Sequence, residues 1–143
     1  MNRVALFLRC MLAFIALCHF TFLPLSRIQA ATKARALPKG TWGGDHITLQ
    51  VTEKGADVEF DCAHGRITQP IRLDHKGNFN LRGTFAPEHG GPVLRDEGSH
   101  DEPVRYVGHT DGRTMTLTVN REKEKLGAFV LAHSRPSNLM KCR

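Results

Sequence analysis

Short segments in which apolar and polar residues alternate one by one recur from residue 47 onward, and turn residues separate them. Ile47, Leu49 and Val51 share one parity, with threonine and glutamine between them. After Glu53-Lys54-Gly55 the same period continues over 56–62. Because successive side chains of a strand point to opposite faces, this period is typical of half-buried β-strands. The two segments and the short turn between them predict a β-hairpin.

The same period accounts for most of the remaining chain. Asp111-Gly112, a preferred pair for a two-residue hairpin turn, stands between two of the segments. Pro70 interrupts another segment, and proline marks an edge or a bend because it cannot donate to a sheet ladder. The predicted strands are 47–52, 56–62, 67–73, 79–85, 104–108, 114–120 and 126–133, and 139–142 could form an eighth.

These segments predict an all-β fold, a small antiparallel meander of seven or eight strands. Many short strands in a chain of 143 residues would leave exposed edges in an open sheet, and closure removes such edges. We therefore expect a closed or nearly closed β-barrel. A long connection over 86–103 carries almost no apolar residue, and a loop of this length is either functional or disordered.

The first 30 residues have the order of a secretory signal peptide. Arg3 and Arg9 precede an apolar run over 10–25, and small residues follow at Ala30. The uninterrupted apolar run is shorter than the ~20 residues that a membrane-spanning helix needs. We expect cleavage near Ala30, with Ala36 as the alternative site, and no permanent membrane span afterwards. The protein is then exported, to the periplasm or out of the cell.

Cleavage would leave a flexible lead over 31–39 and a single β-barrel domain over 40–143. It would also remove two of the four cysteines, so that Cys62 and Cys142 would be the only pair in the mature chain. In an oxidising compartment such a pair predicts one disulfide bond. This bond would close a loop of about 80 residues, which the chain-entropy model associates with roughly 4 to 5 kcal/mol of stability.

The charge of the chain bears on its partners. Twenty Lys and Arg against 14 Asp and Glu give a formal net charge of +6. Loss of residues 1–30 would remove three arginines and no acid, which leaves a mild excess of basic residues interspersed with acids. Nucleic-acid binding requires a concentrated basic patch, so the sequence does not predict a nucleic-acid partner.

Gly40-Thr41-Trp42, directly before the first predicted strand, resembles the first motif of lipocalins and other calycin barrels. The resemblance implies that Trp42 plugs one end of the barrel. It also implies that Arg135, after the last long strand, packs over the tryptophan.

Three further motifs resemble those of a group of small exported bacterial proteins of unknown function. They are Gly40 to His46 (Gly-x-Trp-Gly-Gly-x-His), Glu59 to Gly65 (Glu-Phe-Asp-Cys-Ala-His-Gly) and Lys141-Cys142. The resemblance implies no activity, and it supports the pairing of Cys62 with Cys142.

The sequence contains no catalytic motif. Ser99, Ser134 and Ser137 all lie outside a Gly-x-Ser-x-Gly elbow, and Cys62 is expected to be oxidised. We therefore predict a non-enzymatic binding or scaffold protein that needs no cofactor. Its partner would be a small apolar ligand or an envelope or secreted protein, and its oligomeric state is left open. The candidate ligand-lining residues are Phe60, Phe85, Tyr106 and Met115.

A metal-binding protein or metal-dependent enzyme is the alternative. His46, Asp61 and His64 could come together if the first two strands are neighbours, and imidazole and carboxylate are common ligands of transition metals. A second, weaker candidate is the cluster of acids and histidines in the long loop, Glu88, His89, His100 and Asp101.

Overall fold

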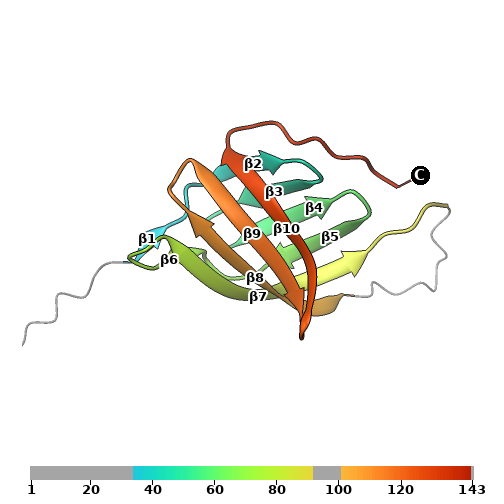
Figure 1. Ribbon diagram of the computed structural model, residues 1–143, viewed down its shortest axis with the longest axis horizontal. Coiled ribbons are helices and arrows are strands. Elements are labelled where there is room, and N and C mark those ends of the chain that lie inside the picture. Colours follow the sequence, from blue (N-terminus) through green and yellow to red (C-terminus); the bar gives the residue numbers. More distant parts are fainter. Residues whose placement is uncertain (1–33, 92–100, 143) are drawn as a thin grey trace, which may run out of the picture. The chain divides into compact units, whose positions relative to one another are not determined.

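A computed structural model describes residues 34–91 and 101–142. These residues form an all-β structure in which eight antiparallel strands close into a barrel, in the order β10-β2-β3-β4-β5-β7-β8-β9 (Figure 1). This confirms the predicted fold class. The barrel strands are β2 (Gly40–Gly44), β3 (Ile47–Val51), β4 (Ala56–Phe60), β5 (Ala63–Ile67), β7 (Asn78–Pro87), β8 (Glu102–Thr110), β9 (Thr114–Arg121) and β10 (Glu124–His133).

The alternating pattern of the sequence places the core inside the barrel. Ile47, Leu49 and Val51 of β3 are buried, and in the antiparallel register Ile47 lies opposite Phe60 and Leu49 opposite Val58. This is the predicted first hairpin. Strand β4 ends at Phe60, however, so Cys62 lies in the turn after it and is exposed.

Strand β2 was not predicted, and it supplies the eighth strand of the barrel. It pairs with β3 along its whole length and with β10 from Gly44 to Trp42. Three of its five residues are glycine, which has a low strand propensity and hides the alternation. The expected eighth strand at 139–142 is not formed. The C-terminal segment instead makes a single bridge, between Asn138 and Asp45.

The predicted strand at 67–73 is broken. Only its first residue, Ile67, belongs to β5, whose earlier residues were not predicted as strand, and its end forms β6 (Arg72–Leu73), which leaves the barrel and pairs with β1 (Arg35–Ala36). Pro70 stands in the break, where no ladder donor is needed. Because Leu37 after β1 is only 3% exposed, the described part of the expected flexible lead belongs to the folded domain.

The connection between β7 and β8 is shorter than predicted. Strand β7 continues to Pro87 and β8 begins at Glu102, so both ends of the 86–103 segment are strand. Residues 92–100 lie outside the described part, as do the expected signal peptide over 1–30 and its expected cleavage site near Ala30. Within 34–91 and 101–142, no helix is long and apolar enough to cross a membrane.

Large aromatic side chains fill the barrel where its wall has glycine. The ring of Tyr106 lies against Gly83, where an added Cβ would stand 2.7 Å from it, and the phenol oxygen lies close to Gly65 in the same way. Phe79 covers Gly108, its partner across β7 and β8. These glycines leave the space that the rings occupy, so the centre of the barrel is packed by side chains.

Candidate functional site

Trp42 is the largest side chain of the core and is completely buried. Its Nε1 donates to the carbonyl oxygen of Pro38 at 3.0 Å, and its ring packs against His133 with 4.9 Å between ring centroids. Arg135, the residue expected to pack over Trp42, is exposed. Trp42 therefore occupies a core position compatible with a plug, and its aromatic neighbour is His133.

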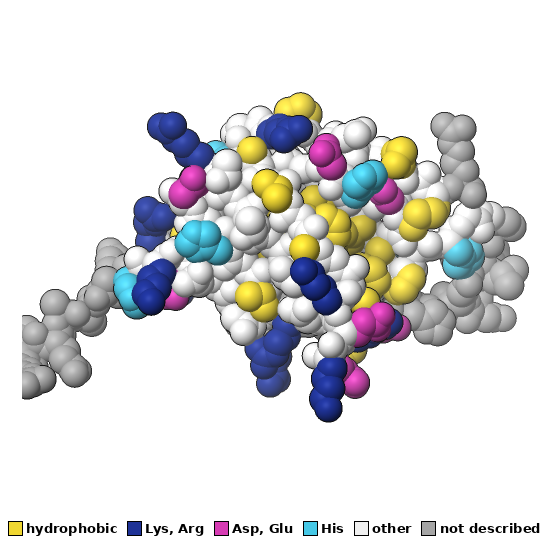
Figure 2. Space-filling model, viewed as in Figure 1, with side chains coloured by type: hydrophobic (Ala, Val, Ile, Leu, Met, Phe, Trp, Pro, Cys, Tyr) yellow, Lys and Arg dark blue, Asp and Glu magenta, His cyan; other side chains and the backbone are white. Residues whose placement is uncertain are grey.

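An apolar groove lies where β4, β7 and β9 end and β10 begins. Its volume is about 270 Å³. Figure 2 shows hydrophobic side chains gathered in the hollow beside β10. We call this feature the mouth groove; it is lined by Phe60, Ala63, Phe85, Val119, Leu126 and Phe129, with His46, Asp61 and Cys62 at its rim.

Three phenylalanines form the floor of the mouth groove. The ring of Phe60 lies 5.4 Å from that of Phe85 and 5.4 Å from that of Phe129, and both pairs are tilted. These distances are typical of favourable aromatic contacts. Phe60 is nearly buried by its neighbours, whereas Phe85 and Phe129 are half-buried. The floor is therefore apolar, preformed and accessible from outside.

The groove stays open because β10 is longer than its contact with β2. Strand β10 pairs with β2 only from Leu131 to His133, so its earlier residues have β9 as their sole described partner strand. A register shift between Lys125 and Gly127 makes Leu126 an extra residue in the ladder, a β-bulge. Bulges re-aim side chains, and Leu126 here lines the groove.

Two of the four predicted lining residues lie elsewhere. Phe60 and Phe85 line the mouth groove, but Tyr106 and Met115 lie in the packed core and are 0% and 1% exposed. They hold the barrel together and do not face the groove. Phe129 was not predicted as a lining residue, although the apolar composition of 126–133 was a signal that this strand contributes to an apolar surface.

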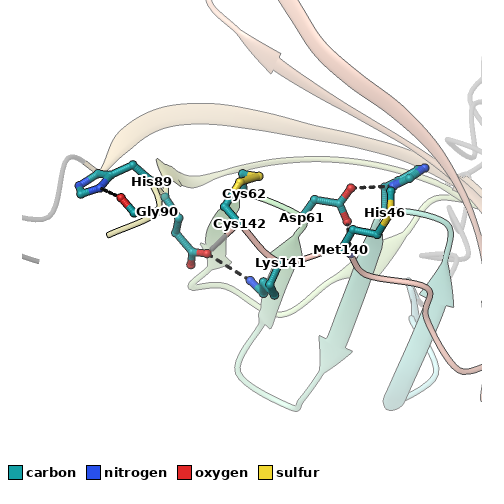
Figure 3. The surroundings of a disulfide bond; sticks show 9 residues. His46, Asp61, Cys62, His89, Gly90, Met140, Lys141 and Cys142 are labelled. Carbon is teal, nitrogen blue, oxygen red and sulfur yellow. Dashed lines mark hydrogen bonds and ion pairs between the residues drawn. A yellow bond between two sulfur atoms is a disulfide. The ribbon is translucent and has the colours of Figure 1, made fainter. Parts of the chain in front are cut away.

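The Cys62–Cys142 disulfide predicted from the cysteine count is present, and it fastens the C-terminal segment to the rim of the groove. Around it, the backbone N–H of Met140 donates to Asp61 Oδ1 at 2.8 Å, and that of Cys142 donates to the Asp61 carbonyl at 3.3 Å (Figure 3). The bond links positions 80 residues apart in the sequence. The rim is thus held covalently and by hydrogen bonds.

A chain of charged groups continues from the disulfide along the outside of β4 and β5. Lys141 Nζ lies 2.7 Å from Glu59 and 3.3 Å from Glu88, and Glu88 in turn accepts from His64 Nδ1 at 2.8 Å. Partial burial would raise the pKa of Glu88, but the hydrogen bonds from His64 and Lys141 outweigh it and hold that pKa below its ordinary value. The network therefore favours an ionised Glu88.

The proposed metal ligands are separated. His46 Nδ1 lies 2.6 Å from Asp61 Oδ2, but His64, on the outer face of β5, pairs with Glu88. Within the described ranges, no group of three or more His, Cys, Asp or Glu is placed to hold a metal ion. The hydrogen bond from the Met140 backbone is the main reason that the pKa of Asp61 is lowered. His46 and Asp61 thus form a rim contact; of the weaker loop cluster, His100 lies outside the described residues.

Comparison with known proteins adds no assignment. No family model, no curated protein and no solved structure matches the chain. The resemblances to calycin barrels and to small exported bacterial proteins therefore stay expectations. What the geometry offers is an open apolar groove with a fixed rim, which suits binding.

Proposed function

We propose that this chain is an exported β-barrel binding protein that takes a small apolar ligand in the mouth groove. The observation that carries the proposal is the accessible floor of Phe60, Phe85 and Phe129. Ligand sites are concave and mostly apolar, with a few polar groups at the edge, and His46 and Asp61 supply such groups here.

The size of the groove limits the ligand. At about 270 Å³ it lies slightly below the usual 300 to 1,000 Å³ of small-molecule pockets. It fits one aromatic ring system or a short acyl segment, and the rest of a larger ligand would remain outside. The packed centre of the barrel, with Tyr106 and Trp42 completely buried, supports binding at the mouth in place of an internal cavity.

Export is part of the proposal. A disulfide is compatible with an oxidising compartment. Within residues 1–30, basic residues, an apolar run and small residues follow one another, and this order favours a cleaved signal peptide. The mass of the protein recovered without reducing agent tests this part. We expect a chain that starts near Ala31 and lacks two hydrogens; a full-length or reduced chain would contradict it.

Binding is tested by titration with N-phenyl-1-naphthylamine, a neutral probe that fluoresces in apolar surroundings. Phe129→Ala and Val130→Ala form a matched pair, because Phe129 lines the groove while its neighbour Val130 is 67% exposed. Loss of the ring should weaken probe binding about tenfold or more, given the ~1.5–3 kcal/mol of burying a large apolar side chain. Val130→Ala should leave it unchanged. Equal affinity of the two variants would contradict the proposed site.

A further inference from the structure

The outer face of three neighbouring strands is almost free of acids. Strands β7, β8 and β9 lie side by side, and Glu102 is the one acid in their sequences (Figure 1). Glu102 is paired with Arg121, which also binds Glu124 at 2.8 Å. The carboxylate of Glu102 is therefore already engaged at one end of the three strands.

Arg82 and Arg105 lie directly opposite each other on this face. They are register partners across β7 and β8, and both side chains are exposed. Among the described residues no acid lies within ion-pair distance of either guanidinium, and Arg105 donates instead to Asn80 Oδ1 at 3.0 Å. Like charges directly opposite on adjacent strands destabilise a sheet, so this pair carries an electrostatic cost that an anion between them would remove.

The surroundings of the two arginines match an oxyanion. Asn80 and Thr84 flank Arg82 on β7, and Asn120 is the β9 partner of Arg105, so amide and hydroxyl groups surround the pair. Guanidinium groups bind phosphate oxygens through two parallel hydrogen bonds. On β4 and β5, by contrast, a basic and an acidic side chain pair across the strands, as Arg66 does with Asp57 at 2.7 Å. Arg82 and Arg105 have no such acidic partner among the described residues.

The shape of this outer face bears on the kind of oxyanion ligand that Arg82 and Arg105 could contact. It is the outside of a barrel wall, and both arginines are exposed on it, so it does not enclose a small free ion. His109, also exposed, extends the basic strip along β8. A strip of this kind contacts several anions at once when they are arrayed on a surface.

We propose that the outer face of β7–β9 docks on a membrane surface rich in anionic phospholipid, with head-group phosphates held by Arg82 and Arg105. This goes beyond the proposed ligand binding and does not depend on it, because the mouth groove has different residues. Basic residues near an anionic bilayer each contribute about 1 kcal/mol, which corresponds to about fivefold in the partition coefficient for each arginine.

The test is co-sedimentation of the full chain with vesicles of phosphatidylglycerol and phosphatidylcholine, compared with vesicles of phosphatidylcholine alone. The measured quantity is the ratio of the two partition coefficients, so that any contribution from residues 1–30 that is independent of lipid charge cancels. The test variant is Arg82→Gln with Arg105→Gln. The matched control is Arg35→Gln with Arg113→Gln, which removes the same charge from two exposed arginines outside this face.

We expect the ratio to fall about 25-fold in the test variant and much less in the control. Arg82→Lys with Arg105→Lys should bind between the wild type and the glutamine variant, because lysine keeps the charge but loses the two parallel hydrogen bonds. Thermal unfolding should show that all variants fold. Equal losses in test and control would overturn the proposal, because net charge alone would then explain the binding. No preference for anionic vesicles, or full displacement by millimolar inorganic phosphate, would overturn it as well. Probe binding in the groove should be unchanged throughout, which separates this test from that of the proposed function.

Discussion

Tyr106 donates its phenolic hydrogen to the carbonyl oxygen of Thr84, 2.7 Å away, from within the barrel. The ring reaches this oxygen because Gly65 and Gly83 leave the wall without side chains there. The contact ties the centre of β8 to its neighbour β7 on the inner side of the barrel wall. The buried ring contributes packing, and the hydrogen bond of its hydroxyl fixes the orientation of the side chain in the core.

Tyr106→Phe should therefore lower the free energy of unfolding by about 1 kcal/mol, because the ring stays and one hydrogen bond is lost. Urea unfolding at neutral pH measures this change. An unchanged midpoint would show that the hydrogen bond contributes nothing net.

Tyr106 should also resist ionisation, because burial raises its pKa above the ordinary value. The stability that the neutral phenol contributes is fully present below the unfolded-state pKa near 10 and is lost as the pH rises further. Tyr106 is the only tyrosine of the chain, so absorbance of tyrosinate reports on it alone. We expect that absorbance to appear together with alkaline unfolding; its appearance in the folded barrel near pH 10 would contradict the burial.

Gly108→Ala should destabilise the barrel by roughly 1–3 kcal/mol, the usual cost of an overpacked core. A Cβ at this position would stand 2.2 Å from the ring of Phe79. Combining it with Phe79→Leu tests the cause, since a smaller side chain relieves the clash. The double variant should be more stable than the sum of the two single effects predicts, and strict additivity would rule out the steric explanation.

Replacement of Cys62 and Cys142 by serine should lower the free energy of unfolding by about 4 kcal/mol, from the chain-entropy model for a closed loop of this length. Denaturant unfolding measures the difference between the variant and the oxidised protein. A reducing agent should destabilise the wild type and leave the variant unaffected. A loss of stability below about 1 kcal/mol would contradict the chain-entropy model, because it would show that removing the disulfide adds little conformational entropy to the unfolded chain.

Asp74 links stability to acidity. Its carboxylate accepts from the backbone N–H groups of Asn78 and Lys76, each at 2.8 Å, and these bonds, that of Asn78 first, lower its pKa to about 2. The pKa of Asp74 is lower in the folded than in the unfolded protein. The stability that its carboxylate contributes is therefore complete above about pH 4 and is lost as the pH falls toward 2.

Asp74→Asn should therefore be less stable than wild type at pH 6, and the difference should shrink as the pH falls from 4 to 2. Urea midpoints across this range measure it. Asp45→Asn is the control, since the exposed Asp45 side chain has no hydrogen bond to the described residues. A difference that is constant with pH would contradict the linkage.

The sequence predicted the barrel because most wall strands alternate cleanly, as β3 and β4 do. It did not predict β2, because Gly40, Gly43 and Gly44 carry no side chains to show a period. Their role is visible only in three dimensions: a Cβ at Gly43 would stand 2.1 Å from the backbone oxygen of Arg135, so the C-terminal segment needs that glycine. The run 63–67 was missed for a related reason, since Gly65 occupies a core-facing position.

The site was only partly predictable. Phe60 and Phe85 have the parity of core residues, and the sequence could not show that their strand ends meet at an open mouth. Tyr106 and Met115 have the same parity but lie deeper along their strands. The pairing of His64 with Glu88 depends on where β7 ends, which the composition of the loop after Pro87 did not reveal. The alternation of residues along a strand shows whether a side chain faces the inside or the outside of the barrel. Its position along the barrel axis depends on the register between strands, which the sequence does not show.

Strand β10 is joined to β9 by eight residue pairs and to β2 by three. The barrel therefore has a seam, and protection of amide hydrogens from exchange should be lowest there, because the fewest ladder bonds must break. Since β10 also forms one side of the mouth groove, opening at Gly43 and Ala132 would widen the groove while the other seven strands remain paired. A small ligand reaches the accessible floor without this opening, whereas a ligand too large for the closed groove would bind only while the seam is open.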